Sequence, residues 1–386
     1  MENDLVKFTK EMLSIESISS QGKDCSKITE ACDLLCNYLS PIGFKCRHFP
    51  VNNGKIYTDS LYAKYGSGKK NIMFSGHVDV VPAGNIENWD SHPFSAEEKD
   101  GYIVARGVAD MKGGVTCFAH AAKRFINDYK DFDGSISMMI AGDEEEPFIE
   151  TTKEMCEILS KEGEVWDIAL VGEPSNSYKI GDTIKNGRRG GVEVRIESFG
   201  TQGHDAYPHL ADNAIHHLVE LTNKYVNKKL DDGNKYFPSS SLQIINIDVD
   251  NKSTNTIPGF AKCLICIRFN NLQNVESIKK FFNEEIEKTE GNFKIDFNFF
   301  GEPFLTSSDN FYLQNLKGII KTNTNINPEL STAGGTSDGR YIKDYCDVFE
   351  FGLVNDSIHK TNEKARVSDL ILLEKIYYDF LVKSLI

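Results

Sequence analysis

Five histidine or carboxylate side chains stand where a short apolar run of this chain gives way to a turn. They are His77, Asp110, Glu145, Glu173 and His359. Three of the runs, KNIMFSGHVDVV, GSISMMIAGDEE and WDIALVGEP, have the composition of buried strands that end in polar residues. In open α/β sheets, ligands collect beyond the carboxyl ends of the strands. The pattern therefore predicts that these side chains meet at one edge of a mostly parallel sheet.

The order of the segments predicts two domains, one inserted into the other. The first 185 residues alternate helix-like and strand-like runs, and VTCFAHAAKRFI has the helical spacing of a crossover helix. From about Gly190 the order becomes strand, helix, strand, strand, helix, strand, which is a ferredoxin-like unit. Because metal-type residues stop at Glu173 and resume at His359, we expect residues 1–188 and 302–386 to form one catalytic domain around an insert at 189–301.

Composition narrows the class of protein. With 386 residues, 40% of them hydrophobic, the chain can bury the core of a soluble globular protein. The formal charge of -14 argues against nucleic acid or an anionic membrane as a partner. The start, MENDLVKFTKEML, lacks the basic and apolar regions of a signal peptide, and the nine cysteines are scattered. We therefore expect a cytoplasmic protein that acts on small molecules.

Two histidines and three carboxylates suffice for two zinc-sized ions if one carboxylate bridges them. Glu144 adjoins Glu145 and is placed to carry a proton, and Asp79 follows His77 in an HxD pattern that can orient a ligating imidazole. Each motif alone has an ordinary structural alternative. Asp110 could be a helix N-cap, and the acidic run GDEEEP could be a solvated turn.

Taken together, HxD, ADMKGG, DEE, GEP and a late histidine resemble the zinc aminoacylase and carboxypeptidase family of metallopeptidases. The resemblance covers nearly the whole chain. It is closest to the members that cleave an N-succinyl amide in diaminopimelate and lysine biosynthesis, because four longer strings also match. These are KNGRRGG at 185–191, TQGHDAYPHLADN at 201–213, STAGGTSDGRY at 331–341 and GLVNDSIHKTNE at 352–363.

The resemblance implies a zinc-exopeptidase-like α/β catalytic domain and an inserted ferredoxin-like domain through which two copies form a homodimer. It implies two divalent ions per subunit, zinc or alternatively cobalt, with the following ligands: His77 and Glu173 for one ion, Glu145 and His359 for the other, and Asp110 between them, followed by a cis peptide bond. It also implies that Asp79 orients His77, that Glu144 is the general base, and that His204 stabilises the oxyanion in the partner's site.

The implied substrate carries several carboxylates, so an acidic protein must supply local cations for it. Arg188 and Arg268 occupy positions that the family uses for this purpose. The other positions that match substrate contacts are Tyr207, Asn255, Gly335, Thr336 and Asn355. Two residues depart from the family pattern: Gly191 replaces a serine, and Asp205 replaces a small apolar residue beside His204.

Two alternative functions remain open at this stage. A sister enzyme with the same metals would deacetylate acetylornithine or cleave dipeptides. A protein of another class would bind metal without catalysis, as a sensor or scaffold. The second alternative predicts loss of the base, whereas Glu144 is present together with every expected ligand.

Overall fold

The computed structural model describes residues 3–19, 26–52, 57–145 and 150–386. The chain divides into two compact units. Unit 1 comprises residues 1–186, 305–331 and 337–386, and unit 2 comprises residues 187–304 and 332–336. The expected boundaries, at 188/189 and 301/302, lie within three residues of these divisions. The short return of residues 332–336 to unit 2 was not expected.

Unit 1 is built on a mixed sheet with a parallel centre, as the alternation of segments predicts. The strands, in spatial order, are Lys45–His48 (β1), Leu61–Gly66 (β4), Gly134–Ala141 (β8), Lys70–His77 (β5), Ile168–Val171 (β9), Val348–Glu350 (β20), Thr183–Lys185 (β10) and Glu329–Ser331 (β19). Strands β8, β5, β9 and β20 run parallel to one another, whereas β4 is antiparallel to β8 and β10 is antiparallel to β20. Every residue of β8 is buried, as expected for a strand covered on both faces.

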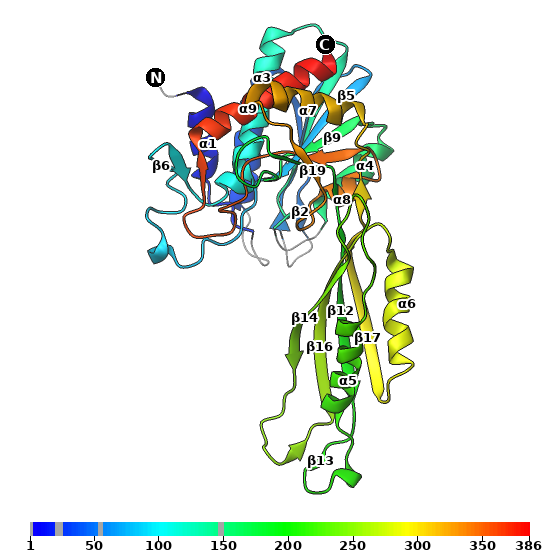
Figure 1. The fold of residues 1–386 in the computed structure, drawn as a ribbon. Coiled ribbons are helices and arrows are strands. Elements are labelled where there is room, and N and C mark those ends of the chain that lie inside the picture. The colour runs from blue at the N-terminus through cyan, green and yellow to red at the C-terminus, as the bar shows by residue number, and fades with distance from the viewer. Residues whose placement is uncertain (1–2, 20–25, 53–56, 146–149) are drawn as a thin grey trace. The chain divides into compact units, whose positions relative to one another are not determined.

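Helices lie on both faces of this sheet (Figure 1). They are Asp4–Leu13 (α1), Ser26–Leu39 (α2), Gly113–Asp128 (α3), Thr151–Lys161 (α4), Phe311–Thr324 (α7), Gly339–Ile342 (α8) and Val367–Leu385 (α9). Phe118 of α3 stacks on Phe74 of β5 with 4.4 Å between ring centroids, and Tyr377 of α9 meets the same ring edge-on. On the opposite face, the Cys156 sulfur of α4 lies 3.7 Å from that of Met139 in β8.

Shorter elements complete unit 1. They are the strands Val51–Asn52 (β2), Tyr57–Thr58 (β3), Glu97–Lys99 (β6), Tyr102–Val104 (β7) and Lys364–Arg366 (β21), and the helical turns Ser40–Ile42 (η1), Ile86–Asn88 (η2) and Val108–Lys112 (η3). Strands β21, β7 and β6 form a small antiparallel sheet. The strands Gly187–Arg188 (β11) and Phe304–Leu305 (β18) lie where the chain passes between units 1 and 2.

Unit 2 has the predicted strand and helix order. Its sheet consists of Ser241–Asp248 (β14), Phe260–Phe269 (β16), Gly190–Phe199 (β12) and Asn292–Gly301 (β17), all antiparallel and in that spatial order. Ala214–Asn227 (α5) and Val275–Ile286 (α6) cover one face (Figure 1). Alternate residues of β12, such as Val192, Val194 and Ile196, are buried against them. A loop region carries Gly203–His204 (β13), Pro208–Leu210 (η4) and Thr256–Ile257 (β15).

Two glycines allow the segment before α3 to approach its neighbours closely. A Cβ on Gly113 would lie 2.3 Å from the carbonyl oxygen of Val108, and one on Gly114 would lie 2.8 Å from that of Gly172. A side chain at position 114 would therefore push the start of α3 away from the Gly172 backbone, which precedes Glu173. The peptide bond between Asp110 and Met111 is cis, as the resemblance implied.

Candidate metal centre

Three of the five metal-type side chains, those of His77, Glu145 and Glu173, come from segments that the parallel strands bring to one edge of the sheet. His77 is the last residue of β5, where it pairs with Ala141 at the end of β8, and Ser75 pairs with Val171 at the end of β9. Glu145 and Glu173 follow β8 and β9 by a few residues. His359, which lies in the segment between β20 and β21, has a backbone φ of 59°. The sheet thus explains how residues far apart in sequence become neighbours.

Asp110 stands between two sets of side chains. Its Oδ1 lies 3.2 Å from His77 Nε2, and its Oδ2 lies 3.4 Å from His359 Nε2. Glu173 Oε1 is 3.5 Å from His77 Nε2, and Glu145 Oε1 is 2.9 Å from His359 Nε2. In each of the two resulting sets, which share Asp110, the ligand atoms lie within 4.8 Å of one another. This is the arrangement that a carboxylate bridging two cations requires.

Glu144 is close to these ligands without belonging to the two sets that share Asp110. Its Oε2 lies 4.0 Å from His77 Nε2, and with His77 and Glu145 it forms a third group of possible ligand atoms. Burial raises the pKa of the Glu144 carboxyl well above its usual range, and the charges of Asp338 and Glu145 act in the same direction. Burial therefore favours the protonated form of this carboxyl group, which is placed to carry a proton beside the ligands.

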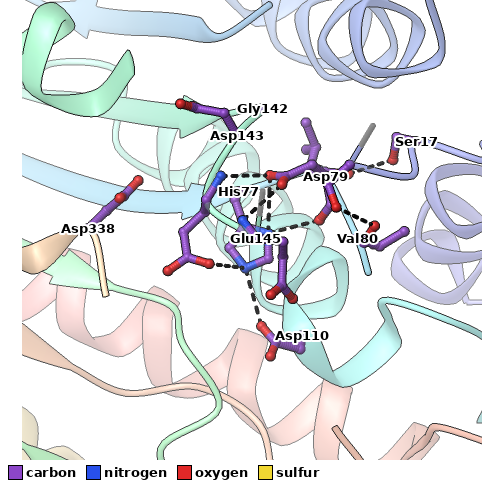
Figure 2. Close-up of polar contacts among 12 residues, drawn as sticks. Ser17, His77, Asp79, Val80, Asp110, Gly142, Asp143, Glu145 and Asp338 are labelled. Atoms are coloured by element: carbon purple, nitrogen blue, oxygen red, sulfur yellow. Dashed lines mark hydrogen bonds and ion pairs between the residues drawn. The ribbon is translucent and has the colours of Figure 1, made fainter. Parts of the chain in front are cut away.

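His77 is oriented by a backbone group. Its Nδ1 lies 2.9 Å from the backbone carbonyl oxygen of Asp79 and 3.6 Å from that residue's carboxylate, which the sequence analysis expected to be the partner. A carbonyl can only accept, so Nδ1 carries the hydrogen and Nε2 of the neutral ring is left to bind a metal. The Asp79 carboxylate instead accepts hydrogen bonds from the backbone N–H groups of Glu144 and Glu145, at 3.3 and 3.0 Å. Figure 2 shows Asp79 beside Glu145. Asp79 therefore positions the two glutamates.

The pKa values of the cluster reflect burial and the close approach of its carboxylates and histidines. Burial raises the pKa of Glu173 well above its usual range, and the Asp110 and Glu144 charges add to this effect. Hydrogen bonds to Asp110 and Glu145 raise the pKa of His359 to about 10. Burial alone would raise the pKa of Asp110, but its hydrogen bonds with the two histidines hold it well below the usual range. A divalent ion that bound these ligands would displace the protons that they hold.

Sequence reasoning missed Glu363, which supports the Asp110 turn from behind. Its carboxylate accepts hydrogen bonds from the backbone N–H groups of Gly107, Ala109 and Asp110, at 3.0, 2.9 and 3.2 Å. The Arg106 guanidinium donates a further bond at 2.6 Å, and both side chains are almost fully buried. The sequence offered one signal for this role, namely that a charged residue stands four positions after His359. Its partners become visible only in the fold.

Replacing Glu363 by alanine is expected to lower the free energy of unfolding by about 3–5 kcal/mol, because the Arg106 charge and three N–H donors would stay buried without an acceptor. Urea denaturation would measure the loss. Glu97→Ala, on exposed strand β6, is the matched control. A change of less than about 1 kcal/mol in the Glu363 variant, typical of a surface pair, would contradict this role.

The expected substrate residues fall into four groups. In unit 2, Arg188 Nη1 donates to the carbonyl oxygen of Gly335 at 3.3 Å, and Thr336 follows in the same segment. Arg268 lies in β16 opposite Gly191. Elsewhere in unit 2, the backbone N–H of Asp205 donates to the Asn255 carbonyl, and the His204 and Tyr207 rings lie 5.6 Å apart. Asn355 belongs to unit 1, where its backbone N–H donates to Asn176.

None of the helices in the described part of the chain combines the length and the apolar character that crossing a membrane requires.

Comparisons with known proteins agree on one family. Residues 73–383 match the model of the peptidase family M20/M25/M40. The chain is 40% identical over 383 residues to a succinyl-diaminopimelate desuccinylase of Rickettsia bellii, covering 98% of this chain and 96% of that protein. It is 39% identical over the full length of both chains to the enzyme of that name from Hydrogenovibrio crunogenus. An M20 family metallo-carboxypeptidase structure from Sulfolobus solfataricus has a TM-score of 0.79 at 19% identity, covering 98% and 99% of the two chains.

Proposed function

The chain belongs to the peptidase family M20/M25/M40, and we propose that it hydrolyses N-succinyl-L,L-2,6-diaminopimelate to succinate and L,L-2,6-diaminopimelate, a step of diaminopimelate and lysine biosynthesis. Relatives that carry the corresponding enzyme name are about 40% identical to it over almost the whole chain. The observation that carries the proposal is Asp110, whose two carboxylate oxygens face different histidines at 3.2 and 3.4 Å.

For the cofactor, we propose two divalent ions, zinc in the first instance and cobalt as an alternative. His77 and Glu173 would hold one ion, Glu145 and His359 the other, and Asp110 would bridge them. The donor set supports this assignment, since imidazole and carboxylate ligands suit zinc and related ions. The bound ions would supply Lewis acidity toward water and the amide carbonyl.

The side chains of the protein would then move the proton and hold the substrate. Glu144, held through its backbone by Asp79, would take a proton from water and return it to the departing amine. His204 would donate to the oxyanion in the partner's site. Its Nδ1 is engaged by the Ala206 N–H and Asp205, so that among the described residues Nε2 is left for a substrate. Arg188 and Arg268 would bind carboxylates, and Tyr207, Asn255, Gly335, Thr336 and Asn355 would contact the rest of the substrate.

The substrate assignment is tested by turnover of the metal-loaded protein. We expect kcat/KM for succinyl-diaminopimelate to exceed that for acetylornithine by about a hundredfold or more, because an acetyl group offers Arg188 and Arg268 no carboxylate to bind. Equal or better turnover of acetylornithine would favour a sister deacetylase. No turnover of either compound at full metal occupancy would favour a metal-binding protein without catalysis.

We also propose a homodimer formed through unit 2. Strand β14 is an edge of its sheet, and Ile245 and Ile247 on that strand are 60% and 54% exposed. On α5, Val219 and Val226 are similarly exposed, at 53% and 55%. An edge strand with exposed apolar side chains offers both backbone hydrogen bonds and apolar area to a second copy.

Sedimentation is expected to show a dimer that dissociates more readily when Ile245 and Ile247 are both replaced by lysine, because two charges would then be buried at the contact. Val165→Lys is the matched control, since this residue of unit 1 is 72% exposed and lies outside the proposed interface. A wild-type protein that sediments as an active monomer would rule the dimer out.

A further inference from the structure

Gly191, Arg268 and Phe300 lie close together on adjacent strands at one end of the unit 2 sheet. Gly191 of β12 pairs with Arg268 of β16 on one side and with Gly301 of β17 on the other. The register between β12 and β17 shifts after Gly191, so that Val192 pairs with Phe299 and Phe300 has no partner in β12. Phe300 is therefore the extra residue of a β-bulge, a feature that re-aims a side chain.

The Phe300 ring occupies the space that a side chain at position 191 would need. A Cβ on Gly191 would lie 2.0–2.8 Å from three ring atoms of Phe300, far inside van der Waals contact. The ring also lies under the Arg268 guanidinium, whose central carbon is 4.8 Å from the ring centroid. Gly191 and Phe300 thus act as a pair, since the glycine makes room for the ring and the ring supports the arginine.

The arginines of this region have hydrogen-bond donors left over. Among the described residues, neither Nη1 of Arg268 nor Nε of Arg189 has a hydrogen-bond partner, although both atoms are buried. Burial and the charge of Arg268 both lower the pKa of Arg189, which indicates that the two guanidinium groups lie close together. Buried guanidinium donors are normally satisfied, and a carboxylate is the ligand that their fork geometry fits.

We propose that Phe300 determines acyl specificity by holding the Arg268 guanidinium in place for the free carboxylate of a dicarboxylic acyl group. The proposal rests on the proposed function and extends it to a residue outside the expected site. Stacking restricts the arginine before substrate arrives, so less freedom is lost on binding. Phe300 acts through Arg268 and is therefore a positioning residue. Replacing it should weaken the binding only of substrates whose acyl group ends in a carboxylate.

The test compares Phe300→Leu, which removes the aromatic face but keeps apolar bulk, with Phe300→Tyr, which keeps the face. The metal-loaded enzyme is assayed with succinyl-diaminopimelate and with the acetyl derivative of the same amine. We expect the leucine variant to raise KM about threefold to tenfold for the succinyl compound alone, with kcat little changed, and the tyrosine variant to restore the wild-type KM. Phe260→Leu, at the far end of the same sheet, is the matched control.

A second arm tests the pairing of Gly191 with Phe300. Gly191→Ser alone should raise KM for the succinyl compound, because its side chain collides with the ring. In the double variant with Phe300→Ala, the serine has room. It should therefore raise KM for the succinyl compound by a smaller factor than Gly191→Ser does when Phe300 is present. Additive effects in the two single variants and the double variant would overturn the steric pairing.

Succinate binding by calorimetry separates this inference from the proposed function. We expect the leucine variant to bind succinate more weakly by the same factor as the rise in KM, with an unchanged unfolding temperature. If the wild type cleaves no succinyl amide but succinate affinity still depends on Phe300, the proposed function fails and the inference stands. If the leucine variant binds succinate as tightly as the wild type does, or if its KM rises equally for the succinyl and acetyl compounds, the inference is overturned.

Discussion

Glu144→Ala is expected to lower kcat by about two to four orders of magnitude while metal content stays at the wild-type level. The carboxyl lies 4.0 Å from His77 Nε2, outside the two ligand sets that share Asp110, so its loss removes the proton carrier and leaves the ligands in place. Steady-state kinetics, together with elemental analysis of the same samples, would measure both quantities.

The control for this variant is Glu154→Ala, which removes an exposed acid from helix α4 and should change neither turnover nor metal content. If Glu144→Ala retained wild-type kcat, another group would have to be the base. If it lost metal in proportion to activity, Glu144 would have to be counted among the ligands.

Asp110→Ala is expected to abolish turnover, by about a thousandfold or more, through loss of both ions. Each of its carboxylate oxygens faces a different histidine, so a single substitution removes a ligand from each set. Glu173→Ala and Glu145→Ala would each weaken only one set. Equilibrium dialysis against zinc, followed by elemental analysis, would separate the three variants. An Asp110→Ala protein that retains two tightly bound ions would exclude the bridging role.

Much of this site could be predicted from sequence because it depends on strand ends. Apolar runs that stop at His77, Glu145 and Glu173 place these residues at one edge of any parallel sheet, whatever the details of the loops. The same logic predicted the strand and helix order of unit 2, where alternation along β12 and β16 marks one buried face. Each of these patterns lies within one short segment, so it can be recognised in a single sequence.

Other features depend on neighbours that only the fold supplies. Asp79 was expected to hold the His77 ring through its carboxylate. That carboxylate instead accepts a hydrogen bond from the backbone after β8, and the backbone carbonyl of Asp79 accepts the hydrogen bond from the His77 ring. Glu363 has the sequence context of an ordinary surface acid and is nevertheless fully buried. The β-bulge at Phe300 interrupts the alternation of side chains between the two faces of the sheet, and strict strand alternation cannot predict such an interruption. In each case the partner is distant in the chain.

The pairing of β9 with β20 has a consequence for synthesis of the chain. Ala169, Leu170 and Val171 pair with residues 348–350, and the intervening sequence includes all of unit 2. A ribosome must therefore have delivered the chain beyond residue 350 before this central pair of strands can form, and beyond residue 359 before the last histidine arrives. Until then the nascent chain holds three carboxylates and a single imidazole at an unfinished sheet. With the proposed ligand set, the site would therefore be completed only near the end of translation, and a fragment that ended before residue 359 would lack one of the proposed ligands.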